Sequence, residues 1–433
     1  MGFAAQLVHA DGETSQARQR GPRSTCGPGR DVAAGRLRLS RISGNDHDRM
    51  PRHRNGVAGR QRRRHAKRAT MSVLRATLPP NRAVWPVPRE DWVVVGLVLT
   101  IIAAVAVIAP AISGEGFKPF WYLSNLLVFT YIAVGVLLAE LSIRIIAARP
   151  DSPVAFVLSA DNRAWLARRL LASLPIAAVA VFMPAFSTMK SSIPLVNAFD
   201  WDATFIAWDR AIHGTDPWRI LQPLMGYPEV TYFTSTLYHW WFALIYVGPF
   251  AFAYYVADRT LRLRFFLAFV GSWTIVGMVF ATALASVGPV FAQPILGIPD
   301  FAPQMEYLRQ ADVVYPIAVL DVQDQLLEWY RAGDYGLGRG ITAMPSMHVA
   351  LAWLYVLAAW PLGRRIGWAF AAFFAATLLS SVHLAYHYAV DGYVAVILVT
   401  VIWWISGKIS KRLVPAGNTP ENRANLSENI KVS

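Results

Sequence analysis

Residues 93–112 read VVVGLVLTIIAAVAVIAPAI, twenty residues in a row without a formal charge. A helix of about 20 apolar residues crosses the hydrocarbon core of a bilayer. Several runs of the same kind follow along the 433-residue chain, which is 55% hydrophobic and 16% charged. Soluble domains carry roughly a quarter charged residues. The sequence therefore predicts an all-α, polytopic bundle of transmembrane helices.

The apolar runs predict about eight spans, and the basic residues between them predict the orientation. The expected spans are residues 93–112, 121–141, 170–187, 230–256, 265–284, 345–361, 366–382 and 388–407. Short cytoplasmic loops are enriched in Lys and Arg. The loops that this layout places inside carry Arg144, Arg149, Arg163, Arg168, Arg169, Arg259, Arg262, Arg264, Arg364 and Arg365. The opposite 285–344 loop is rich in acid, so we expect both termini to be cytoplasmic.

The net charge of +14 is concentrated at the N-terminus, where residues 1–70 hold 16 Arg or Lys and 5 Asp or Glu. This segment has the composition of a disordered tail, although such basic runs also bind nucleic acid or anionic lipids. It lacks the apolar core of a signal peptide. Met71 resembles an ordinary start, so translation from Met71 is a further interpretation. Residues 71–184 are predicted to form N-terminal transmembrane helices, and residues 408–433 a cytoplasmic tail.

Cysteine chemistry is excluded from the folded part, because the only cysteine is Cys26 in the basic tail. Any catalysis must therefore come from His, Asp, Ser, Lys, Arg or Tyr. Two segments outside the membrane are longer than plain linkers. Residues 198–226 predict an amphipathic helix in the membrane interface, since Trp201, Phe205, Trp208 and Ile212 recur near helical spacing. The 285–344 loop is long enough to form a lid or collar.

Two clusters of chemically active residues open or close predicted spans. Residues 342–348 read TAMPSMH and open the sixth span, and residues 380–391 read SSVHLAYHYAVD and join the seventh span to the eighth. Ionisable groups at membrane depth are costly and are functional candidates by default. In the predicted topology both clusters lie at the outer ends of their spans, so they should meet at one depth.

Local chemistry within the clusters points to phosphate. Pro345 suits the first turn of a helix, and the helix N-terminus beside Ser346 would attract an anion. His348 could donate a proton to a leaving oxygen. His387 and Asp391 are four residues apart, which predicts one helix face. A carboxylate that holds one imidazole nitrogen leaves the other free to attack.

These motifs resemble the type 2 phosphatidic acid phosphatase superfamily over about residues 185–407, the predicted catalytic membrane domain. The segment HYAVD at 387–391 is most similar to the branch of inositol phosphorylceramide synthase, an inositolphosphotransferase. The resemblance implies that His387 is the nucleophile, that Asp391 orients it, and that His348 is the general acid. Ser346 would hold the phosphate. No cofactor is implied.

The chain departs from the phosphatase branch in ways that favour the transferase branch. Met347 stands where phosphatases have Gly, Ser381 stands where they have Arg, and their first motif is absent. Other cations must therefore balance the negative charge of the phosphate. We expect these among Lys190, Arg210 and Arg339, all predicted to lie outside.

The leading hypothesis is a lipid phosphotransferase or phosphatase with a phosphohistidine intermediate. Its partners would be a lipid phosphate or phosphodiester, membrane lipid and an acceptor that is either water or an alcohol, with no nucleic acid. The location implied is the bacterial inner membrane, with the site on the periplasmic face. Two alternatives stay open. His383, His387 and Asp391 could bind zinc or iron on one unbroken helix, or the chain could be a non-enzymatic transporter or scaffold.

Overall fold

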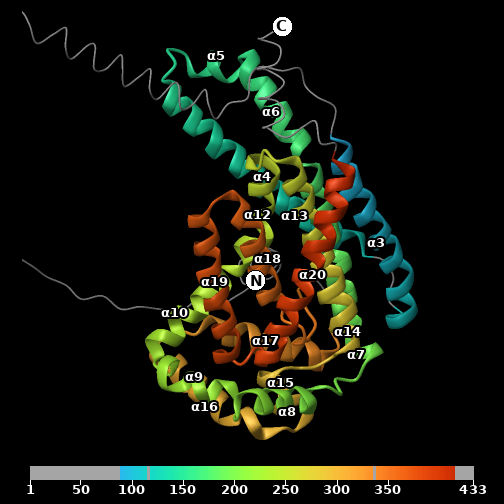
Figure 1. Cartoon of the computed structure of the whole chain (residues 1–433), viewed down its shortest axis with the longest axis vertical. Coiled ribbons are helices and arrows are strands. Elements are labelled where there is room, and N and C mark those ends of the chain that lie inside the picture. Colours follow the sequence, from blue (N-terminus) through green and yellow to red (C-terminus); the bar gives the residue numbers. More distant parts are fainter. Residues whose placement is uncertain (1–87, 115–117, 335–337, 415–433) are drawn as a thin grey trace, which may run out of the picture. The chain divides into compact units, whose positions relative to one another are not determined.

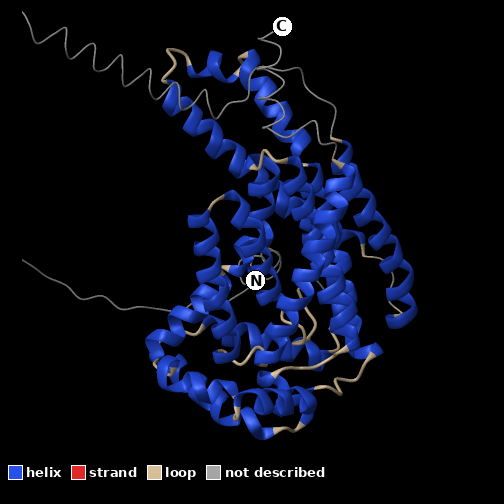
Figure 2. Ribbon diagram, in the orientation of Figure 1, coloured by secondary structure: helices blue, strands red, loops and turns tan. Residues whose placement is uncertain are grey.

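The structure, a computed structural model, describes residues 88–114, 118–334 and 338–414. Every regular element in these ranges is a helix (Figure 2). The helical architecture predicted from the sequence is therefore confirmed for this part of the chain. The predicted basic tail, Cys26, Met71 and residues 415–433 lie outside the described residues.

The first elements are long helices that pack on one another. They are α3 (Arg89–Ser113), α4 (Pro119–Ala148), α5 (Pro153–Val157), α6 (Ala160–Ala172) and α7 (Leu174–Val196). Helix α7 lies against both α3 and α4 and buries most of its apolar side chains. The predicted span 170–187 is thus longer than expected, because the helix continues through Pro194 to Val196.

The middle of the chain forms shorter helices around the ends of the long ones. They are α8 (Asp202–His213), α9 (Pro217–Met225), α10 (Pro228–His239), α11 (Trp241–Tyr246), α12 (Gly248–Tyr255), α13 (Arg259–Thr274), the π-helix η1 (Ile275–Phe280) and α14 (Ala281–Ala283). The predicted 198–226 helix is present as α8 and α9. Phe205 is fully buried while Ile212 is 61% exposed, so α8 buries one face against the protein.

The last third of the chain completes the bundle. Its elements are α15 (Pro289–Leu296), the 3-10 helix η2 (Pro299–Phe301), α16 (Ala302–Val314), α17 (Ala318–Ala332), α18 (Met347–Ala359), the 3-10 helix η3 (Trp360–Leu362), α19 (Arg364–His383) and α20 (Ala389–Leu413). Helix α18 is almost wholly buried and packs against α13, α19 and α20. Helices α8, α9, α15 and α16 gather at one end of the bundle (Figure 1). The 285–344 collar thus consists largely of helices.

Six helical segments in the described part of the chain are long and apolar enough to cross a membrane. They are Arg89–Ser113, Pro119–Ala148, Ala160–Val196, Arg259–Ala283, Arg364–His383 and Ala389–Leu413. The predicted span at 345–361 is a shorter apolar helix, Met347–Leu362. The predicted span at 230–256 is broken into α10, α11 and α12. The total of eight spans, and the cytoplasmic placement of both termini, stay predictions.

The break between α11 and α12 has a local cause. Pro249 has no N–H to continue the helix and sits in the first turn of α12. Gly248 gives room to the Tyr355 side chain, because a Cβ there would overlap the phenol. The Tyr355 hydroxyl donates to the carbonyl of Leu244, just before the break, at 2.6 Å. The predicted span is therefore interrupted between α11 and α12.

Candidate active site

Helix α18 begins beside the candidate catalytic residues. Ser346 is its N-cap and is fully buried, and the Ser346 hydroxyl accepts a hydrogen bond from the amide of Val349 at 3.4 Å. The sequence suggested that Pro345 lies in the first turn of the helix. In the structure Pro345 precedes the helix. The amides that open a helix have no carbonyl partner within it. A helix terminus of this kind attracts anions in other proteins, as the sequence predicts for α18.

A tight turn at residues 384–388 joins α19 to α20. Ala385 adopts a left-handed conformation, with φ of 59°, and its carbonyl accepts from the amide of Val290 at 2.9 Å. Gln304 donates to the carbonyls of Val382 and His383, and Gln323 donates to that of Leu384. The collar helices α16 and α17 thereby hold the backbone that leads to His387.

His387 and Asp391 form a hydrogen-bonded pair. Nδ1 of His387 lies 3.2 Å from Oδ2 of Asp391, and the Asp391 side chain is fully buried. The two residues do not share a helix face, because α20 begins only at Ala389. Asp391 instead closes the first turn of α20 by accepting the amide of Tyr388 at 3.1 Å. The carboxylate can thus fix the imidazole and the helix start together.

His348 faces His387 from the first turn of α18, with ring centroids 6.1 Å apart. Two aromatic rings stack on the His348 imidazole. Trp241 lies 4.0 Å from it at 28°, and Tyr238 lies 4.2 Å from it at 15°. Rings this close and nearly parallel must cover opposite faces of the imidazole. The orientation of His348 is therefore set by packing.

Charge at the site comes from Lys190 on α7, which acts electrostatically on both histidines. Burial lowers the pKa of His387 to about 3, a hydrogen bond with the backbone of Ala343 opposes the shift, and the charge of Lys190 adds to it. His387 is thus a neutral imidazole at physiological pH, as a nucleophile must be. The predicted span ended at residue 187, before Lys190. In the structure Lys190 lies within helix α7.

Two carboxylates of α8 hold the segments that carry the catalytic groups. Asp209 accepts from the amides of Ala389 and Val390 at 2.8 and 2.9 Å. Asp202 accepts from the Tyr388 hydroxyl at 2.8 Å and from the amides of residues 287 and 288 at 3.0 Å. Burial raises the pKa of both carboxyl groups, and these hydrogen bonds oppose the shift.

Sequence reasoning did not single out Asp202 and Asp209. The available signal was their spacing of seven residues, which is two helical turns, on the face of α8 that carries Phe205. Tyr238 and Trp241 were also missed, because their contacts with His348 join segments more than 100 residues apart.

The two candidate arginines are already paired with carboxylates. Arg210 binds Asp216 and Asp300. Arg339 binds Asp334 and lies over the ring of Trp329. Of the three cations predicted to meet phosphate, Lys190 lies within electrostatic reach of His348 and His387, whereas the two arginines are paired with carboxylates.

The structure also separates the residues of the alternative metal site. His383 ends α19, whereas Asp391 belongs to α20, so no single helix presents His383, His387 and Asp391. Nε2 of His383 lies 2.9 Å from the hydroxyl of Thr231. No group of three or more His, Cys, Asp or Glu side chains with metal-site geometry occurs in the described ranges. His383 instead ties α10 to α19.

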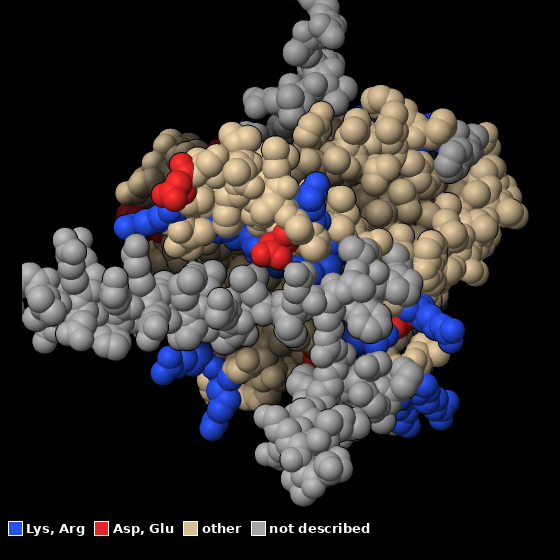
Figure 3. Space-filling view, turned by 90° about the horizontal axis from the view of Figure 1, so that it is seen from above, with Lys and Arg blue, Asp and Glu red and all other residues tan. Residues whose placement is uncertain are grey.

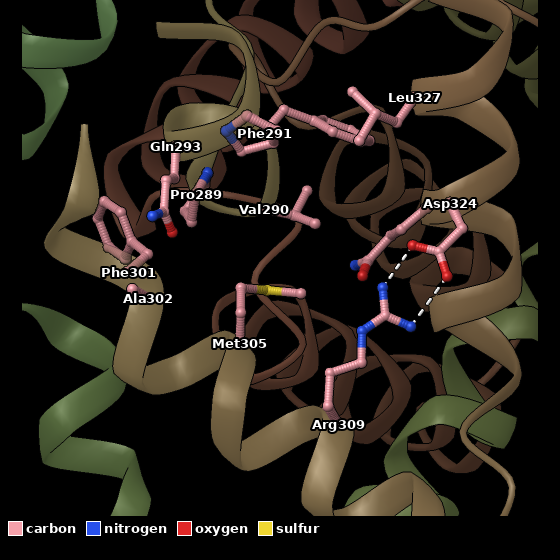
Figure 4. Close-up of a pocket in the computed structure, with 12 residues that line it drawn as sticks. Pro289, Val290, Phe291, Gln293, Phe301, Ala302, Met305, Arg309, Asp324 and Leu327 are labelled. Carbon is pink, nitrogen blue, oxygen red and sulfur yellow. Dashed lines mark hydrogen bonds and ion pairs between the residues drawn. The ribbon is translucent and has the colours of Figure 1, made fainter. Parts of the chain in front are cut away.

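A pocket of about 180 Å³ lies behind the catalytic turn, between the collar helices (Figure 4). Its wall includes Val290 and Gln323, which hold the backbone of residues 384 and 385. Arg309 and Asp324 form an exposed ion pair at its edge. The remaining lining is mainly apolar.

Comparison with known proteins gives one match. Residues 203–405 match the model of the PAP2 superfamily. No curated protein and no solved structure matches significantly. The matched segment begins at α8 and ends within α20, so it contains His348, His387 and Asp391. Together with the apolar helices, this match indicates a membrane protein with a phosphatase-type or phosphotransferase domain.

Proposed function

We propose that this protein is a phosphotransferase that acts on a lipid phosphate or phosphodiester through a phosphohistidine at His387, similar to inositol phosphorylceramide synthase. The observation that carries the proposal is the His387–Asp391 hydrogen bond beside His348 at the start of α18. The PAP2 match supports the wider class of membrane phosphatases and phosphotransferases. The absence of the phosphatase arginine at Ser381 favours transfer over hydrolysis.

The first step makes a nitrogen–phosphorus bond. The carboxylate of Asp391 accepts a hydrogen bond from Nδ1–H of His387, which leaves the lone pair on Nε2 to attack phosphorus. The bond between phosphorus and the leaving oxygen breaks, and His348 gives that oxygen a proton. Asp391 stabilises the positive charge that develops on the ring.

The second step returns the site to its starting state. The hydroxyl of an alcohol, or water, attacks the same phosphorus while His348 takes its proton. The nitrogen–phosphorus bond breaks, and both electrons return to Nε2 of His387. An alcohol acceptor gives a new phosphodiester, and water gives hydrolysis. The mechanism needs His348 protonated and His387 neutral at the start of the first step, and His348 neutral at the start of the second.

The charges favour a donor with one negative charge. Lys190 is the cation beside the histidines, whereas Arg210 and Arg339 are bound to carboxylates. The amides that open α18 add partial positive charge. A phosphodiester carries one charge and a phosphomonoester close to two, so the site suits a phosphodiester lipid better.

The test follows phosphate from a labelled lipid onto the purified protein. ³²P-labelled phosphatidylinositol and phosphatidic acid would be supplied as phosphodiester and phosphomonoester, each with and without an alcohol acceptor. We expect acid-labile, base-stable label on the protein, faster transfer from the diester, and neither label nor turnover in His387→Ala. Wild-type turnover in His387→Ala would overturn the proposal, as would loss of turnover in a chelator with recovery on adding zinc or iron.

We also propose that the site faces the exterior of a bacterial inner membrane. The basic residues support this, because the face seen from the α5–α6 end shows more Lys and Arg than Asp and Glu (Figure 3). Val313 on α16 is 88% exposed, and Arg365 at the start of α19 is also exposed. With Cys26 replaced, an impermeant thiol reagent should label Val313→Cys and not Arg365→Cys when only the outer membrane is permeable. The reverse pattern would overturn the sidedness.

A further inference from the structure

Tyr238 lies at the centre of the aromatic stack that holds the proposed acid. Its ring packs on His348 at 4.2 Å and on Tyr386 at 5.2 Å. The residue is 3% exposed. The ring therefore has a clear packing role. A phenylalanine could fill that role equally well, so packing does not explain the hydroxyl.

The hydroxyl of Tyr238 has no hydrogen-bond partner among the described residues. The neighbouring Tyr386 differs, because its hydroxyl donates to the carbonyl of Val319 at 3.3 Å. A buried hydroxyl without a partner is costly and calls for an explanation. The Tyr238 hydroxyl also lies within electrostatic reach of Asp391 and Tyr386.

Two further donors without a partner belong to residues at or next to contacts of the two histidines. In the described part of the chain these are Nε1 of Trp241, whose ring stacks on His348, and the hydroxyl of Thr342, which precedes the Ala343 backbone that bonds His387. Lys190 and the first amides of α18 add further donors. A phosphoryl group, which offers only acceptors, would satisfy such a set.

We propose that Tyr238 is a further catalytic residue, whose hydroxyl donates a hydrogen bond to a non-bridging oxygen of the transferring phosphoryl group. This inference rests on the proposed phosphoryl transfer at His387. A neutral donor in a buried site stabilises charge that grows as the transition state forms. Ser381 stands where phosphatases have an arginine, and the Tyr238 hydroxyl supplies one of the hydrogen bonds that such an arginine would donate.

The substitution Tyr238→Phe tests the hydroxyl alone, because the ring and its stacking stay. We expect kcat on the ³²P-labelled phosphodiester lipid to fall on the order of 10²-fold, the usual loss for one such donor. KM should change little. Orthovanadate, which adopts the geometry of the transferring phosphoryl group, should inhibit the variant correspondingly less well. Thermal unfolding in detergent should stay unchanged or rise, because an unpartnered buried hydroxyl is removed.

Tyr355→Phe is the matched control, since that hydroxyl is also buried but already donates to the carbonyl of Leu244. We expect a lower melting temperature with kcat and vanadate inhibition as in the wild type. Wild-type kcat and vanadate inhibition in Tyr238→Phe, with label still formed at His387, would overturn the role of Tyr238 and leave the proposed function standing. Absence of label and turnover in the unmodified protein would instead overturn the proposed function.

Discussion

The two ends of the helix bundle both bury carboxylates, but they pair them with different groups. Where α3 and α13 begin, Glu90 binds Arg259 and Asp91 binds Arg262. Where α20 begins, Asp209 accepts two backbone amides. The first kind of contact joins two long helices. The second kind fixes the backbone next to His387.

The choice between arginine and backbone amides as partners of a carboxylate decides whether a cation stays unpaired and able to bind phosphate. A guanidinium beside a phosphate site would add charge that binds the anion, but one that is already held by a carboxylate adds little. Amides of a helix N-terminus hold a carboxylate with donors that the fold already has. Asp209 therefore positions the turn without using a cation.

The largest effect should come from the carboxylate that touches the nucleophile. Asp391→Asn removes the negative charge that faces Nδ1 of His387, because the amide oxygen can take the place of Oδ2 but cannot stabilise the positive charge that develops on the ring. We expect kcat to fall on the order of 10⁴-fold, as in serine-protease triads. Turnover of the labelled lipid measures this, and circular dichroism checks the fold. A loss below about tenfold would contradict the role of Asp391.

A smaller effect should follow from Asp209→Asn, which tests the amide-bound carboxylate. The new NH₂ group faces one of the two amides, so the start of α20 must shift. A misplacement of about 1 Å near the reacting groups costs roughly 10²-fold in rate. We expect a loss of that size in kcat, with label at His387 still detectable after long incubation.

The matched control at the other end of the bundle is Asp91→Asn. Removing one partner of a buried ion pair costs about 3–5 kcal/mol of stability, because Arg262 stays buried without its charge partner. Turnover per folded molecule should match the wild type. Denaturation in detergent and kinetic assays on the folded fraction measure the two quantities. Equal losses of kcat in Asp91→Asn and Asp209→Asn would remove the contrast between the ends.

The sequence predicted which candidate catalytic residues lie together better than it predicted the residues around them. His348, His387 and Asp391 could be grouped because short motifs and one topology placed them at the same depth. Their geometry was less accessible, since the His387–Asp391 contact spans a helix start and not a helix face. Helix starts depend on caps, and local spacing leaves these uncertain by a few residues.

The contacts that hold the site are long-range, and the sequence pattern does not report them. Asp209 meets Ala389 across 180 positions, and Tyr238 meets His348 across more than 100. The amphipathic pattern of 198–226 identified a helix, yet it did not show that α8 packs by Phe205 on Tyr388. The break between α11 and α12 likewise has a partner on another helix, because Tyr355 packs on Gly248 and binds the carbonyl of Leu244.

The smallest expected effect concerns pH and isolates the nucleophile from the acid. In His348→Ala, a donor with a p-nitrophenolate leaving group needs no proton, so its residual turnover reports His387 alone. The pKa of His387 is lowered to about 3 by burial, and an imidazole attacks only in its neutral form. The residual rate should therefore be flat from pH 8 to about 5, whereas an ordinary imidazole would lose half its neutral form near pH 6.5. Initial rates of p-nitrophenolate release, quenched in base, measure the profile. A fall of the residual rate with a midpoint near 6.5 would mean that His387 is hydrated like a surface histidine. The turn that Asp209 holds would then not be buried in the active protein.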